Sequence, residues 1–142
     1  MVAALNLPVR EPFGLAVTGE AEAWQSALEM IVGPEWLRTY HVGSDREMLQ
    51  VVEKGLVHAA VLDDDADWDL DVLQVLRMIR RLNAALPVVV VTRHRDRRWL
   101  ESALRLAAFS VVVKPLELEE LLRQIQRMMI RLDAMLRGQM GL

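Results

Sequence analysis

The sequence predicts one α/β domain, a (βα)5 doubly wound fold in which a five-stranded parallel sheet lies between two layers of helices. Short β-branched runs alternate along the chain with longer segments of helical periodicity, which is the pattern of a parallel sheet with crossover helices. The segment 87–92 (PVVVVT) is apolar without alternation, as expected for a strand that is covered on both faces. The length of 142 residues fits a single domain.

The five expected strands are short apolar runs. The second of them alternates apolar and polar residues, which is typical of a strand near the edge of a sheet. The third runs directly into three aspartates, and the fifth runs into a Lys-Pro pair. The strands are expected at 13–18, 37–42, 58–62, 87–92 and 109–113.

Each strand is followed by a segment whose apolar residues recur every three or four positions, as on one face of a helix. Gly33-Pro34 ends the first helix. Ser44 and Glu47 form a capping-box pattern that begins the second. The helices are expected at 21–32, 44–55, 69–84, 96–107 and 116–137. The domain then spans 13–137, with an extended last helix, and 1–12 is an N-terminal lead.

Composition excludes several functional classes. The chain has no cysteine, so it has no disulfide framework, no cysteine-based metal centre and no thiol nucleophile. A net charge of −3 gives no general attraction to nucleic acid, and the concentrated basic run 93–98 is interpreted as a solvated loop. The N-terminus lacks the pattern of a signal peptide, and the longest strongly apolar stretch near the middle, 86–91, is too short to span a bilayer. We therefore expect a soluble, cytoplasmic protein that binds neither nucleic acid nor a membrane.

Polar residues suited to chemistry follow three of the expected strands. The aspartates 63–65 follow strand three, Thr92 closes strand four and Lys114 closes strand five. Because the carboxyl ends of parallel strands meet at one edge of a sheet, ligands are expected there. A carboxylate that attacks phosphorus needs a cation and fixed donors for the charge that develops, which a lysine, a hydroxyl and Mg²⁺ would supply.

This arrangement, ending in Val-Val-Val-Lys114-Pro115, resembles the CheY-like receiver domain of two-component response regulators. The resemblance covers residues 13 to about 130 and implies a flavodoxin-like sheet with strand order 2-1-3-4-5 and a cis peptide between Lys114 and Pro115. It implies a signalling domain rather than an enzyme. Such a domain accepts a phosphoryl group from a histidine kinase or phosphotransfer protein and acts on a downstream effector protein through protein contacts.

The resemblance also assigns roles to residues. Asp64 is favoured as the phosphoacceptor because it lies 28 positions before Thr92 and aligns without a gap, and Asp63 is the alternative. Thr92 and Lys114 would contact the phosphoryl oxygens. Mg²⁺ would be held by Glu20, Asp64 and Asp63, in a site that is weakened because Gly19-Glu20 stands where the family has two acids.

Further departures from the family lie around the same site, so the chain is expected to be an atypical member. Arg93 replaces a small residue and is expected to cover the acid cluster or to pair with Asp64. Val111 stands where an aromatic residue usually acts as a rotamer switch. Two interpretations stay open: a phosphorylated receiver with altered metal geometry, or a pseudo-receiver that acts by protein interaction alone. A remote third is an aspartate-nucleophile phosphohydrolase, because Asp63-Asp64-Asp65 also fits an Asp-x-Asp motif.

The last helix carries a heptad-like apolar seam that favours a homodimer. The alternatives are that the helix packs on its own domain or that it led into a downstream domain. The seam residues are Leu118, Leu122, Ile125, Met129, Leu132 and Leu136.

Overall fold

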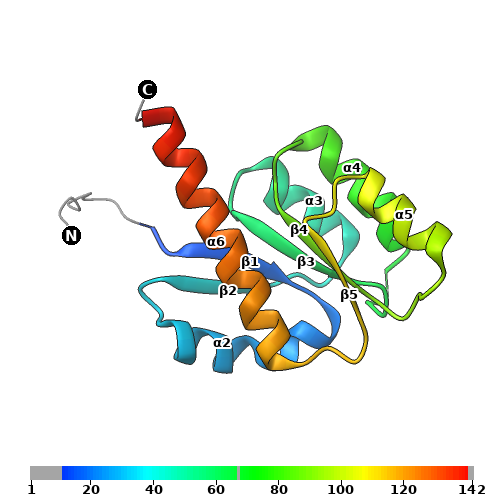
Figure 1. Ribbon diagram of the computed structural model, residues 1–142, viewed down its shortest axis with the longest axis horizontal. Helices are drawn as coiled ribbons and strands as arrows, with labels where there is room; N and C mark the ends of the chain where they lie inside the picture. Colours follow the sequence, from blue (N-terminus) through cyan, green and yellow to red (C-terminus); the bar gives the residue numbers. More distant parts are fainter. Residues whose placement is uncertain (1–10, 67, 141–142) are drawn as a thin grey trace.

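Five parallel strands form one sheet in the order β2-β1-β3-β4-β5 (Figure 1). The computed structural model describes residues 11–66 and 68–140, with side chains up to residue 134, so most of the proposed 1–12 lead lies outside the described residues. The (βα)5 fold and its strand order are confirmed. The elements are β1 (Phe13–Val17), η1 (Gly19–Trp24), α2 (Gln25–Val32), β2 (Leu37–His41), α3 (Asp45–Glu53), β3 (Ala59–Asp63), α4 (Val72–Leu82), β4 (Val88–Thr92), α5 (Arg97–Arg105), β5 (Ser110–Val113) and α6 (Leu118–Met140).

Helices cover both faces of the sheet. α2 and α6 lie on one face, and α3, α4 and α5 lie on the other (Figure 1). The alternation of strand residues divides the core accordingly, because Val61 packs under α2 and α6 whereas Leu62 packs under the other three helices. Every residue of β3 and β4 is buried, as expected for central strands of a parallel sheet.

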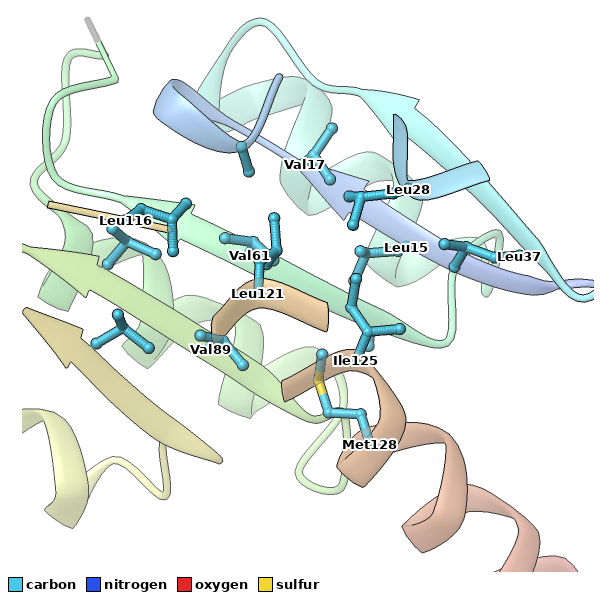
Figure 2. Packing of buried hydrophobic residues seen from close by; sticks show 14 of the residues in the cluster. Leu15, Val17, Leu28, Leu37, Val61, Val89, Leu116, Leu121, Ile125 and Met128 are labelled. Carbon is cyan, nitrogen blue, oxygen red and sulfur yellow. The ribbon is translucent and has the colours of Figure 1, made fainter. Parts of the chain in front are cut away.

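The apolar stripe of α6 packs on the domain's own sheet. Leu121, Ile125 and Met128 are fully buried in the core beneath α6 (Figure 2). Four of the proposed dimer residues are half-buried against the same core: Leu118, Leu122, Met129 and Leu132. Ile125 is thus a core residue of this domain, and the side chain of Leu136 lies outside the described residues.

Helix boundaries differ from the expected ones where side chains cap the backbone. The first helix begins as the 3-10 segment η1 and becomes α-helical only at Gln25. α4 begins at Val72 rather than at residue 69, because Asp71 and Gln74 form a reciprocal capping box. Ser44 caps α3 by accepting from the Glu47 N–H at 3.0 Å, but the Glu47 carboxylate accepts from the Gly43 N–H rather than from Ser44, so only half of the expected capping box forms. In the described part of the chain, no helix is both long enough and apolar enough to cross a membrane.

Candidate functional site

The carboxyl ends of β3, β4 and β5 bring the polar residues expected at this edge close to one another. Asp63 is the last residue of β3, Thr92 is the last residue of β4 and Lys114 follows β5 directly. The Lys114 N–H donates to the Thr92 carbonyl at 2.8 Å, which holds the ends of β4 and β5 in register. The Lys114–Pro115 peptide bond is cis.

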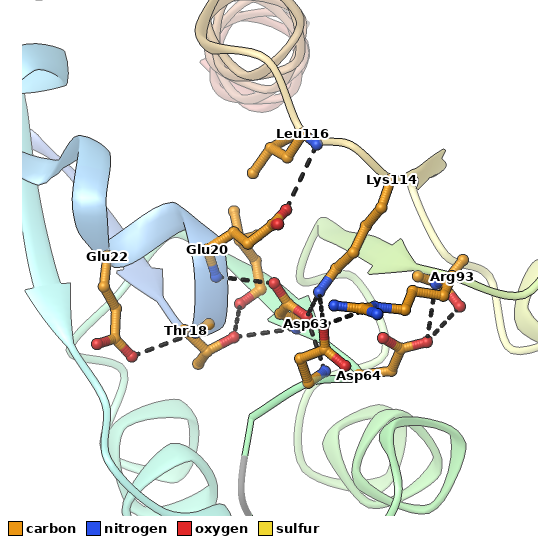
Figure 3. A network of polar contacts seen from close by, with 12 residues as sticks. Thr18, Glu20, Glu22, Asp63, Asp64, Arg93, Lys114 and Leu116 are labelled. Atoms are coloured by element: carbon orange, nitrogen blue, oxygen red, sulfur yellow. Dashed lines mark hydrogen bonds and ion pairs between the residues drawn. The ribbon is translucent and has the colours of Figure 1, made fainter.

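Asp63 is buried, and both of its carboxylate oxygens are occupied. Its side chain is 0% exposed, and Oδ1 lies 2.7 Å from the Lys114 ammonium and also accepts from the Asp65 N–H. Oδ2 accepts from the Glu20 N–H at 2.8 Å. These contacts give the buried charge a cation and fixed dipoles, which a buried carboxylate requires. Figure 3 shows Lys114 extending from the end of β5 to Asp63.

Asp64 points to the other partner expected from the sequence, Thr92. Its Oδ2 accepts from the Thr92 hydroxyl and, at 3.2 Å, from the Arg93 N–H. Its Oδ1 is buried and has no hydrogen-bond partner among the described residues. An unpartnered buried carboxylate oxygen is costly, so this atom would gain from a bound cation or hydrogen-bond donor.

Asp65 and the two cations complete the cluster. Asp65 Oδ2 pairs with the Lys114 ammonium and lies 2.9 Å from Arg93 Nε. The hydrogen bond from Lys114 lowers the pKa of Asp65, and the Arg93 charge acts in the same direction. Burial alone would lower the pKa of Lys114, but its hydrogen bonds to Asp63 and Asp65, with the nearby charges, raise it overall. Lys114 therefore remains protonated, and Arg93 extends over the cluster to pair with Asp65 rather than with the Asp64 carboxylate.

The loop after β1 supports the cluster with its backbone rather than with acidic side chains. Thr18 Oγ1 donates to the Val61 carbonyl and accepts from the Asp63 N–H, so it fixes the end of β3. Gly19 has φ +58°, and a Cβ atom there would lie 2.3 Å from the Asp63 side chain. The Asp63 carboxylate therefore fills the space that a side chain at position 19 would need.

Glu20, expected as a metal ligand, lies at the margin of the site. Its Oε1 accepts from the Leu116 N–H at 3.4 Å, which directs the carboxylate to the turn before α6 (Figure 3). The carboxylates that do lie together are those of Asp63, Asp64 and Asp65, with one oxygen of each within 4.8 Å of the others.

The donor chemistry of this cluster fits Mg²⁺, which prefers carboxylate oxygens. Asp64 Oδ1 is available, whereas one oxygen each of Asp63 and Asp65 is bound to Lys114. The lysine ammonium is thus already the cation of the cluster, and Mg²⁺ would compete with it for two of the three carboxylates.

A cavity of about 470 Å³ opens beside the cluster. Trp68 and Trp99 line it together with the three aspartates, and the Trp99 ring stacks on His94 at 4.5 Å between ring centroids. The two indoles give the site natural fluorescent reporters.

Two residues of the site were missed by sequence reasoning. Asp65 was placed in the acid cluster without a role of its own, although it is the shared partner of Lys114 and Arg93. The third position of the Asp63-Asp64-Asp65 triplet was the available signal. Thr18 was assigned to the first strand without a role, and no motif marks its bridging contacts.

Comparison with known families finds a match to the model of the response regulator receiver domain over residues 17–126. Curated protein sequences yield no match. The family match runs from the last residue of β1 through β2 to β5 and ends within the first half of α6.

Solved structures show the same fold. A CheY-like response regulator receiver domain protein from Methanospirillum hungatei is 17% identical, with a TM-score of 0.68 over 82% of this chain and 92% of that one. A two-component response regulator from Clostridium difficile is 18% identical, with a TM-score of 0.69 over 85% and 98%. The non-phosphorylated HemR receiver domain from Leptospira biflexa is 20% identical, with a TM-score of 0.68 over 82% and 93%.

Proposed function

Because this chain belongs to the response regulator receiver domain family, we propose that it accepts a phosphoryl group on Asp64 and passes the signal on through protein contacts. The donor would be a histidine kinase or a phosphotransfer protein, and the recipient of the signal a downstream effector protein. In the transfer, an Asp64 oxygen forms a bond to phosphorus while the phosphorus–nitrogen bond to the donor imidazole breaks. The imidazole nitrogen leaves with the electron pair of that bond.

The observation that carries this proposal is the state of the Asp64 carboxylate. One oxygen is held by the Thr92 hydroxyl and the Arg93 N–H, and the other has no partner. In Asp63, by contrast, both oxygens are engaged and the side chain is fully buried. Asp64 is half-buried rather than fully buried, and its oriented carboxylate keeps one oxygen unpaired, which supports it over Asp63 as the phosphoacceptor.

The neighbouring groups are suited to the charge that develops on the phosphoryl oxygens. The Thr92 hydroxyl is already on Asp64, and the Lys114 ammonium lies on the two flanking carboxylates. Movement of Lys114 from Asp65 to a phosphoryl oxygen would exchange one anion for another. Asp63, Asp64 and Asp65 would hold Mg²⁺, which supplies further neutralisation of charge when bound.

A second candidate function is that of a pseudo-receiver, which acts by protein interaction without phosphorylation. Lys114 and Arg93 already pair with the acid cluster, and the carboxylate of Glu20 lies outside it. With two cations against three carboxylates, the site is already partly neutralised without phosphorylation or Mg²⁺. This observation favours weak Mg²⁺ binding.

Phosphorylation by acetyl phosphate, followed by intact mass at rising Mg²⁺ concentration, tests the proposal. The variants are Asp64→Asn and Asp63→Asn, with Asp69→Asn as the matched control, because Asp69 is exposed and has no polar contact in the described part of the chain. Near-ultraviolet circular dichroism checks that each variant is folded. We expect the mass gain of one phosphoryl group in the parent and in Asp69→Asn, and none in Asp64→Asn.

The other outcomes separate the alternatives. A mass gain that persists in Asp64→Asn but is lost in folded Asp63→Asn would move the acceptor to Asp63. No modification at any Mg²⁺ concentration, with phosphohistidine donor as well as acetyl phosphate, would leave the pseudo-receiver. Steady release of phosphate from many phosphate esters would indicate a phosphohydrolase.

A further inference from the structure

The surface formed by α4 and α5 carries positive charge that the proposed function does not use. Residues 72–108 contain eight arginines and two acidic residues, a net charge of +6. The rest of the chain has nine basic and eighteen acidic residues, a net charge of −9. Because α4 and α5 lie side by side on the face of the sheet opposite α6, this charge is gathered on one side of the molecule (Figure 1).

Four arginines of these helices do not stabilise the fold through polar side-chain contacts in the described part of the chain. We call them the arginine surface. They are exposed and make neither an ion pair nor a hydrogen bond through their side chains there: Arg77, Arg81, Arg98 and Arg105. The two on α4 are four residues apart, and the two on α5 are seven apart, so each pair shares a helix face.

Arg80 shows what a structural arginine in this region looks like. It is half-buried, and it donates to the Leu106 and Ala107 carbonyls at the end of α5 and to the Leu86 carbonyl after α4. These bonds hold the carboxyl ends of the two helices together. Arg81 and Arg105 lie beside this junction, and no carbonyl or carboxylate of the described chain satisfies them.

Apolar side chains are exposed on the same two helices. Met78 and Leu82 on α4 are 38% and 42% exposed, and Leu104 on α5 is 57% exposed. Arginine and methionine are enriched at the core of protein interfaces, and the planar guanidinium pairs with carboxylates through two parallel bonds. Binding of single-stranded nucleic acid favours stacking aromatics instead, but Trp99, the aromatic residue of α5, already stacks on His94.

We propose that the arginine surface is a docking site for an acidic amphipathic helix of a partner protein. Carboxylates on the partner helix pair with the four arginines, and its apolar side chains cover Met78, Leu82 and Leu104. α4 has 11 residues and is therefore about 16 Å long, which matches about three turns of a partner helix. The four arginines of this site are separate from the Asp63–Asp65 cluster.

Fluorescence anisotropy with a defined probe tests this assignment. The probe is a labelled helical peptide of about three to five turns, with glutamates along one side and leucines along the other. In the variant Arg81→Glu/Arg105→Glu we expect the dissociation constant to rise by at least tenfold. In the matched control Arg38→Glu/Arg46→Glu, which makes the same charge change at exposed arginines elsewhere, we expect less than a threefold rise. Leu82→Ser should also weaken binding, because the apolar side of the peptide loses its contact.

Three results would overturn the proposal. Equal binding of a peptide in which every glutamate is replaced by glutamine would show that the arginines do not pair with carboxylates of the partner. An equal loss of affinity in the control variant would mean that net charge alone attracts the peptide. Tighter binding of a duplex DNA or of phosphatidylserine vesicles than of the peptide, lost in Arg81→Glu/Arg105→Glu, would assign the surface to nucleic acid or to a membrane.

Discussion

At Gly19 and Gly55, two left-handed glycines differ in their surroundings and so separate backbone strain from a steric clash. Gly19 has φ +58° with Asp63 where its Cβ would be, and Gly55 has φ +68° with nothing within 4 Å. Gly55→Ala should lower the free energy of unfolding by about 1–2 kcal/mol, the cost of a left-handed residue. Gly19→Ala should lose about 1–3 kcal/mol more, because the Asp63 side chain must also be displaced.

Urea unfolding of the two variants measures this difference. Equal losses for Gly19→Ala and Gly55→Ala would show that Asp63 can move away freely, so that its contacts with Glu20 and Lys114 would not be fixed by packing.

Asp65 should make stability depend on pH in the acid range. Its pKa in the folded state is lowered, first of all by the hydrogen bond from Lys114. A lowered carboxyl pKa gives stability that is present above the unfolded value, about 4, and is lost as the pH falls through the folded value. Asp65→Asn should therefore be less stable than the parent at pH 7, and the difference should shrink at lower pH.

Thermal or urea unfolding from pH 7 down to about pH 3 follows this change, in the acid range in which carboxylates titrate. Asp69→Asn is the control, since Asp69 is exposed and has no polar contact among the described residues. A difference between Asp65→Asn and the parent that stays constant over this range would argue against an ionic role for Asp65.

The roles of the three consecutive aspartates could be predicted only in part from the sequence. In a parallel sheet the carboxyl ends of the strands lie at one edge, so the sequence could predict that Thr92 and Lys114 lie near the aspartates. In the structure Thr92 contacts Asp64 and Lys114 contacts Asp63. Which of the three aspartates is buried, and which lie in the loop, depends on where β3 ends. Because β3 includes Asp63, that side chain is buried, and the next two residues turn away into the loop.

Among the elements, α6 provides a direct test of which helix face holds the fold together. Ile125 is fully buried in the core, whereas Ile130 is 68% exposed on the same helix. Ile125→Ala should lower the free energy of unfolding by about 2–5 kcal/mol, because it leaves a cavity. Ile130→Ala should change it by less than about 0.5 kcal/mol, as is usual for surface positions.

Chemical unfolding of both variants at two protein concentrations checks this prediction. A large loss for Ile130→Ala that appears only at the higher concentration would mean that a second chain covers this face of α6.

The element boundaries that sequence periodicity misplaced are those decided by local hydrogen bonds. Periodicity indicates which residues face the core, but the first turn depends on which side chain caps the backbone. Asp71 and Gln74 cap each other, so α4 begins three residues later than its apolar pattern suggests. At the start of the first helix, the left-handed Gly19 and the contact between the Glu20 N–H and Asp63 accompany the 3-10 geometry of η1.

For the whole molecule, the layered (βα)5 architecture could be predicted from general rules of α/β folds, whereas the strand order β2-β1-β3-β4-β5 was implied by the family resemblance. Right-handed crossovers place α2 and α6 on one face and the other helices on the opposite face. The segregation of charge between residues 72–108 and the rest of the chain was also present in the sequence. The fold adds that these arginines lie on two neighbouring helices, α4 and α5, which is what the proposed docking site rests on.

The far end of α6 is where a homodimer through this helix would form. Among the side chains described, up to residue 134, the last core contact of α6 is Leu132, but the helix continues to Met140, about 12 Å further, and extends past the sheet (Figure 1). Two helical turns without tertiary packing are marginal in water, and residues 133–140 include Met135, Leu136 and Met140. We therefore expect a mass of two chains by light scattering at tens of micromolar. Leu136→Glu on the seam should reduce it to one chain, while Ala134→Glu, which adds the same charge at an exposed position off the seam, should leave it unchanged. If the parent has the mass of one chain at this concentration, the prediction is wrong and the α6 seam serves only to pack the helix on its own domain.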